Sequence, residues 1–142
     1  MRQLLTQRGR MTVGDTKRLI MDDGKFTTGR RITKFEIWPD SPSNTGEVGI
    51  IMSLNDTVTP TSFDASDSRQ IAWGYRTADA AGVAGAFQFV LDPDHIIVGD
   101  AFLTAVGTEG VAINYVIQME FEKISDTQCV LQLIKERQQD DL

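Results

Sequence analysis

Short apolar or alternating segments, separated by turn-forming residues, run along almost the whole chain. Eight or nine such segments recur at spacings of about ten residues, with glycine, proline, asparagine, aspartate and serine between them. No segment of strand character is followed by a long helical one, as a nucleotide-binding α/β fold requires. The pattern therefore predicts an all-β fold, an antiparallel β-sandwich of about eight strands in a single domain over residues 1–142.

The clearest strand pattern lies near the end of the chain. Polar residues alternate there with an apolar set that falls on one face of a strand: Ile113, Tyr115, Ile117, Met119 and Phe121. Gly107–Gly110 predicts a hairpin between this segment and residues 100–106, and Asp23–Gly24 predicts another. The polar stretch 56–68 exceeds a usual hairpin connection, so we expect it to cross between sheets or to carry contacts.

The last segment changes period. Ser125 and Gln128 fit a capping box, and apolar residues then recur with helical spacing from Val130 to Ile134. Lys135 and Arg137 come late in the segment, where cations favour the helix dipole. The sequence predicts one short terminal helix over residues 126–139.

Charge is unevenly distributed. Residues 1–35 carry nine Lys or Arg and three Asp, a net charge of +6, whereas residues 36–142 carry a net charge of −12. Residues 1–29 are predicted to form a basic amino-terminal arm or hairpin region. Its basic residues are interleaved with apolar ones, which favours solvent-facing positions on strands, although a basic end and an acidic body also attract each other between copies. The residues expected at such a subunit contact are Arg8, Arg10, Lys17, Arg18, Arg30 and Arg31.

Several function classes are excluded or disfavoured. The acidic body would repel nucleic-acid phosphates, so nucleic acid is a disfavoured partner. The longest uncharged stretch, Ala80 to Leu91, has 12 residues, short of the roughly 20 that a membrane-spanning helix needs, and Arg8 precedes any apolar core of a signal peptide. One His and one Cys provide neither a His-rich metal site nor an internal disulfide.

Catalysis is not expected. A dyad of His95 and Cys129 is conceivable, but Cys129 falls in the apolar register of the predicted helix, where a buried thiol is inert. Carboxylates such as Asp92, Asp94 and Asp100, or Asp64 and Asp67, lack the spacing of a calcium loop and are typical of turns. We therefore expect no enzyme activity and no cofactor.

Three aromatic residues suggest an alternative function. Trp38, Trp73 and Tyr75 could stack on sugar rings, and strand alternation puts Trp73 and Tyr75 on one face. The sequence favours core packing for both tryptophans, because aromatic residues dominate sandwich cores. The alternative function is that of a carbohydrate-binding β-sandwich module, in which calcium could assist sugar binding.

The second half of the chain carries a resemblance. Phe89-Val-Leu-Asp-Pro-Asp-His-Ile-Ile-Val-Gly-Asp100 and Ile113-Asn-Tyr-Val-Ile-Gln-Met-Glu120, with the ending Gln138-Gln-Asp-Asp-Leu142, resemble the closing portion of small jelly-roll or β-sandwich virion structural proteins of environmental phages and viruses. The resemblance implies a jelly-roll-like fold and a non-enzymatic virion subunit, either a capsid protein or a capsid-associated decoration protein. Its partners would be copies of itself and other virion proteins, with assembly in the host cytoplasm and no role for a membrane.

Overall fold

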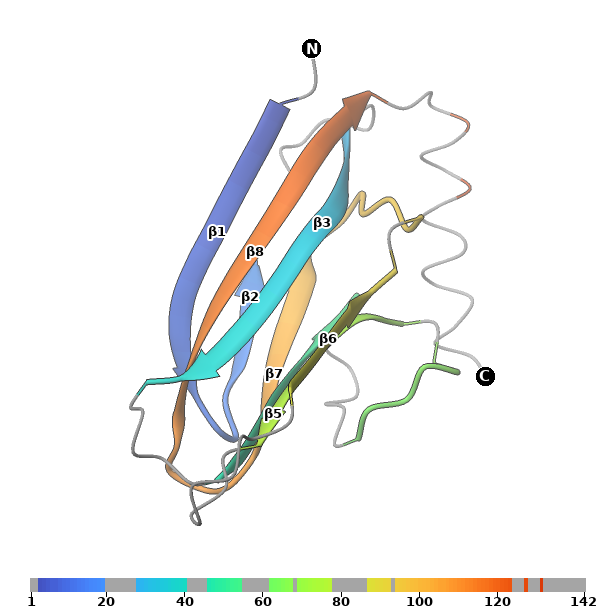
Figure 1. Ribbon diagram of the computed structural model, residues 1–142. Helices are drawn as coiled ribbons and strands as arrows, with labels where there is room; N and C mark the ends of the chain where they lie inside the picture. The colour runs from blue at the N-terminus through green and yellow to red at the C-terminus, as the bar shows by residue number, and fades with distance from the viewer. Residues whose placement is uncertain are drawn as a thin grey trace.

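The computed structural model describes residues 3–19, 28–40, 46–54, 62–67, 69–77, 87–92 and 94–123, together with residues 127 and 131. Eight strands form two antiparallel sheets that pack against each other as a β-sandwich (Figure 1). The strands are β1 (Gln3–Thr12), β2 (Thr16–Leu19), β3 (Thr28–Pro39), β4 (Glu47–Ser53), β5 (Gln70–Thr77), β6 (Phe87–Leu91), β7 (Ala101–Gly107) and β8 (Ala112–Lys123). The predicted all-β antiparallel sandwich is confirmed.

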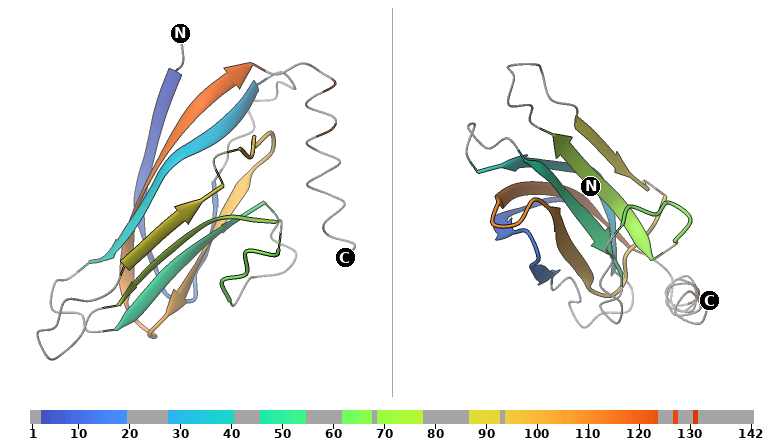
Figure 2. Two further views of the ribbon diagram at one scale, coloured as in Figure 1. Left: turned by 45° about the vertical axis from the view of Figure 1, so that its right-hand side comes forward. Right: turned by 90° about the horizontal axis from the view of Figure 1, so that it is seen from below.

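Strands β4, β5 and β6 pair with their sequence neighbours, whereas β1 and β2, β2 and β3, β3 and β4, and β7 and β8 are neighbours in sequence that lie in different sheets. One sheet has three strands in the order β1-β8-β3, and the other has five in the order β2-β7-β4-β5-β6. A tight turn at residues 13–15 joins β1 to β2, so these two strands form the edges of opposite sheets on the same side of the sandwich (Figures 1 and 2).

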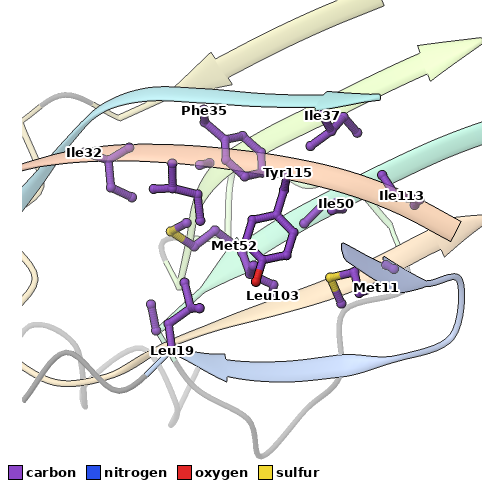
Figure 3. Packing of buried hydrophobic residues seen from close by; sticks show 14 of the residues in the cluster. Met11, Leu19, Ile32, Phe35, Ile37, Ile50, Met52, Leu103, Ile113 and Tyr115 are labelled. Atoms are coloured by element: carbon purple, nitrogen blue, oxygen red, sulfur yellow. The ribbon is translucent and has the colours of Figure 1, made fainter. Parts of the chain in front are cut away.

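The inward faces of the two sheets make the core. On β8, Ile113, Tyr115, Ile117 and Met119 are each at most 2% exposed, which confirms the predicted face for these four. They meet Ile50, Met52 and Leu103 from the five-stranded sheet, which are likewise buried (Figure 3). Full burial of one such side chain contributes roughly 1.5–3 kcal/mol, so this interface dominates the stability of the fold.

A β-bulge in β3 turns three of its large apolar side chains toward the core. Ile32 and Phe35 are three positions apart, so a regular strand would turn them to opposite sides. The pairing register with β8 shifts between Ile32 and Lys34. The additional residue lets Ile32, Phe35 and Ile37 all face the core, where each is at most 2% exposed.

Several sequence predictions differ from the structure or fall outside the described residues. The two predicted hairpins are wrong, because the strands that flank Asp23–Gly24 (β2 and β3) and those that flank Gly107–Gly110 (β7 and β8) lie in different sheets. Asp23 and Gly24 themselves lie outside the described residues, as does most of the helix predicted over 126–139. Only Thr127 and Leu131 of that helix are described, both helical. Residues 95–98 form no strand, and Ile97 makes a single bridge to Arg30 of β3. In the described part of the chain, no helix has the length and apolar character needed to cross a membrane.

Candidate functional site

The backbone of β1 has a free edge. Val13 N–H donates to Val111 O at 3.0 Å, and Asp40 N–H donates to Ala112 O at 2.9 Å. The backbone N–H and C=O groups of odd-numbered β8 residues therefore point toward β1, and those of even-numbered residues point toward β3. The even-numbered residues of β1 therefore turn their N–H and C=O groups away from β8. Thr12 N–H donates a hydrogen bond to Asp15 Oδ2 at 3.1 Å. Within the described ranges, nothing pairs with the outward backbone groups of Leu4, Thr6, Arg8 and Arg10.

Cationic side chains surround this edge. Arg8 and Arg10 are exposed on the outer face of β1, and Lys17 and Arg18 are exposed on β2. A hollow of about 470 Å³ lies between the two edge strands and is lined by Arg8, Lys17 and Arg18 among others. We call β1 and β2 with Arg8, Arg10, Lys17 and Arg18 the basic edge.

Two of these cations are held in place. The Lys17 ammonium lies 5.4 Å from the ring centre of Tyr115, a cation–π arrangement. Arg18 forms an ion pair with Asp100, and its Nε donates to Asp100 Oδ2 at 2.7 Å. Among the described residues, no acid forms an ion pair with Arg8 or Arg10. These two arginines therefore supply charge that a partner can use.

Arg30 and Arg31 lie away from the basic edge, on β3. Arg30 is only 8% exposed and its guanidinium carbon stands 5.0 Å from the ring centre of Phe121. Its backbone exchanges two hydrogen bonds with Ile97, at 2.9 and 2.7 Å. Arg31 is half-buried on the outer face, opposite Glu120. The structure thus brings together four of the six predicted contact residues and separates these two.

A second feature lies on the outer face of the five-stranded sheet. Trp73 and Tyr75 of β5 stand opposite Val90 and Gln88 of β6, and Phe63 lies edge-on to Tyr75 with ring centres 5.9 Å apart. A hollow of about 270 Å³ opens among these side chains. We call it the aromatic pocket, lined by Phe63, Trp73, Tyr75, Gln88 and Val90.

The expectation that both tryptophans pack in the core is wrong. The inward positions of β5 hold Ala72 and Gly74, and a Cβ on Gly74 would stand 3.0–3.1 Å from atoms of Phe35 and Ile37. Phe35 and Ile37 of β3 fill the core opposite Gly74, so this part of β5 has no room inside for a large side chain, and Trp73 and Tyr75 point outward. Trp38 is also outward, on β3, and is 37% exposed. It lies in the other sheet, in register with Asn114 and Arg10, and does not join the aromatic pocket.

Gln70 organises the aromatic pocket. Its side-chain oxygen accepts from Trp73 Nε1–H at 2.7 Å and from Asp64 N–H at 3.0 Å, while its Nε2 donates to Ser62 O at 3.3 Å. Gln70 is 6% exposed, so these bonds are shielded from water. One buried amide therefore fixes the orientation of the Trp73 ring and the position of the segment that carries Phe63.

The acidic residues considered for calcium act in turns and ion pairs. Asp64 Oδ1 accepts from Ser66 N–H, and Asp92 Oδ1 accepts from Asp94 N–H, at 3.0 and 3.1 Å. Arg69 donates to Asp67, and this hydrogen bond lowers the pKa of the Asp67 carboxyl. In the described ranges, no three His, Cys, Asp or Glu side chains gather as a metal site would require. Cys129 lies outside those ranges, and His95 is 6% exposed.

Sequence reasoning missed Phe63, Gln70 and the unpaired backbone of β1. Phe63 stands inside the polar stretch 56–68, and the contacts expected of that stretch were the only signal for it. No protein-family model, curated protein or solved structure matches the chain.

Proposed function

We propose that the protein is a non-enzymatic structural subunit of a virion, a capsid or capsid-associated decoration protein, that assembles through contacts between its own copies and with other virion proteins. One observation carries the proposal: β1 is a long edge strand, bordered by exposed arginines, whose outward backbone groups have no partner among the described residues. Such an edge accepts a strand from another chain, with main-chain bonds giving affinity and side chains giving selectivity.

A jelly-roll assignment supports this choice. A jelly roll wraps its eight strands so that the first, eighth and third share one sheet while the second, seventh, fourth and fifth share the other. The observed orders β1-β8-β3 and β2-β7-β4-β5 agree with that winding. The sixth strand departs from it, because β6 pairs with β5, and the bridge from Ile97 to Arg30 lies where a jelly roll would attach its sixth strand to the third. Jelly rolls build viral capsids, and also lectins, so this support is by analogy of fold.

Charge selects the partner surface in this proposal. Residues 36–142 carry a net charge of −12, so a second copy offers an acidic surface to the basic edge. Arg8 and Arg10 project from the outer face while their backbone groups face the free edge, so an incoming strand meets both hydrogen-bonding groups and cations. Their attraction raises the association rate and disfavours basic partners. The assembled protein would reside in the virion.

Proline at position 6 tests strand addition directly. Thr6 N–H points away from β8, so Thr6→Pro removes a donor from the free edge without breaking the β1–β8 ladder. We expect the native mass from light scattering to fall from an oligomer to a monomer, while far-ultraviolet circular dichroism stays unchanged. Thr6→Ser is the matched control and keeps the oligomer. An unchanged oligomer in a folded Thr6→Pro variant, or a monomeric parent protein, would refute the proposed mechanism.

A further inference from the structure

The aromatic pocket lies on a different sheet from the basic edge and serves no purpose in the proposed assembly. The five described residues that line it come from β5, β6 and the 62–67 segment, and none of these five is charged. β5 and β6 lie side by side at the edge of the five-stranded sheet opposite β2 (Figure 2). From this pocket we infer that the protein binds a neutral saccharide, with one pyranose ring seated against Trp73 and Tyr75.

The lining matches the surface chemistry of a sugar ring. A pyranose presents an apolar face of C–H groups, which packs on aromatic rings, and an equatorial belt of hydroxyl groups, which needs both donors and acceptors. Trp73 and Tyr75 supply two rings, two positions apart on one face of β5. Gln88 stands beside Tyr75 in register and is exposed, and its amide offers a donor and an acceptor.

The pocket is organised before any ligand arrives. The hydrogen bond from Trp73 Nε1–H to buried Gln70 fixes one ring, and Phe63 packs edge-on against the other. Rings that are already held in place lose little conformational entropy on binding. This lowers the free-energy cost of binding a small ligand, such as a single sugar, that makes few contacts. Gln70 is a positioning residue here, because its amide oxygen is already engaged by Trp73 and Asp64.

The size and charge of the pocket limit which ligands can bind there. A hollow of about 270 Å³ is below the ~300–1,000 Å³ of sites for drug-sized ligands, so it accommodates one ring rather than a long chain. The described lining side chains carry no charge, which disfavours nucleotides and acidic sugars, because their phosphate or carboxylate groups would find no cation among these side chains. A neutral ring at the end of an oligosaccharide fits both limits.

Tryptophan fluorescence can report on this pocket alone. The chain has two tryptophans, so Trp38→Phe leaves Trp73 as the only reporter. We would titrate this variant with five neutral sugars: cellotetraose, maltotetraose, laminaritetraose, mannotetraose and tetra-N-acetylchitotetraose. At least one should give a saturable change with a Kd tighter than about 1 mM. Trp73→Phe, which leaves only Trp38 on the other sheet, should give none.

Further substitutions in the Trp38→Phe background locate the ligand. Tyr75→Ala should weaken binding at least about tenfold, Gln88→Ala several-fold, and Tyr75→Phe little, because it keeps the ring. Circular dichroism checks that each variant is folded, and Tyr75→Phe remains informative if Tyr75→Ala unfolds.

Three results would overturn the inference. The first is the absence of a saturable change with all five sugars up to about 10 mM. The second is binding that survives Tyr75→Ala unchanged. The third is emission that follows protein concentration but not sugar, which would make the pocket a contact between copies. Sugar binding by the Thr6→Pro monomer would separate this inference from the assembly proposal, since each can then fail alone.

Discussion

The two outer faces of the sandwich rest on one core but differ in chemistry. The three-stranded sheet presents charged rows, in which Arg8 of β1 lies across β8 from Glu36 of β3, and Lys34 pairs with Glu36 at 3.6 Å. The five-stranded sheet presents Trp73 and Tyr75 in the aromatic pocket, whose described lining side chains are all uncharged. Strand alternation allows this difference, because an outward residue can change without disturbing the inward ones on either side. On these strands the inward residues build the core, and the outward residues set the chemistry of each surface.

The largest expected effect tests that separation on β8. Ile117 is fully buried, and Ile117→Ala should reduce the free energy of unfolding by about 2–5 kcal/mol, through lost burial and the cavity left behind. Val116, its outward neighbour, is the matched control, and Val116→Ala should cost about 1 kcal/mol or less. Denaturant unfolding measures both. Equal losses would contradict the assignment of an inner and an outer face.

Two glycines sharpen the comparison within the five-stranded sheet. Gly74→Ala places a methyl group 3.0–3.1 Å from Phe35 and Ile37 in the core, and should cost about 1–3 kcal/mol of stability by overpacking. Gly49→Ala places its methyl group against the exposed ring of Phe63 on the outer face, which can swing away. We expect a smaller stability loss but an altered Trp73 emission. The reverse ranking in denaturant unfolding would show that the two faces are misassigned.

Gln70 supports the aromatic pocket, because its buried amide accepts a hydrogen bond from the outward Trp73 ring. Gln70→Leu leaves Trp73 Nε1–H and Asp64 N–H without their acceptor, and should cost about 1–2 kcal/mol. Trp73 should become more mobile, seen as a fall in fluorescence anisotropy in the Trp38→Phe background. Unchanged anisotropy in a folded variant would mean that packing alone positions the ring.

The smallest expected effect is a pH dependence next to the pocket. The Arg69 hydrogen bond lowers the pKa of Asp67 in the folded protein. Its stabilisation is therefore complete above the unfolded aspartate value of about 3.9 and is lost as the pH falls through the lower folded value. Asp67→Asn should remove this part of the acid sensitivity, as thermal unfolding between neutral and acidic pH can show. An identical pH profile in parent and variant would assign the acid sensitivity to other carboxyls.

The sequence was most informative where alternation and turns coincide. β7 agrees within one residue with the predicted segment 100–106, and the buried face of β8 follows from residues 113–119 alone. The outward orientation of Trp73 could not be predicted, because it depends on Phe35 and Ile37 occupying the space opposite Gly74. The free edge of β1 also depends on strand order, which periodicity does not encode. Gln70 has no local signal, since its partners lie three to eight residues away in a loop and a strand.

The most direct measurement of the central claim is the native mass of the untagged protein by light scattering, from low salt to about 1 M, where the screening length falls to ~3 Å. We predict an oligomer at low salt that loosens as salt rises, and a folded Arg8→Glu/Arg10→Glu variant that fails to form it. A monomer whose mass does not change with salt, or an oligomer indifferent to both salt and charge reversal, would contradict assembly through the basic edge.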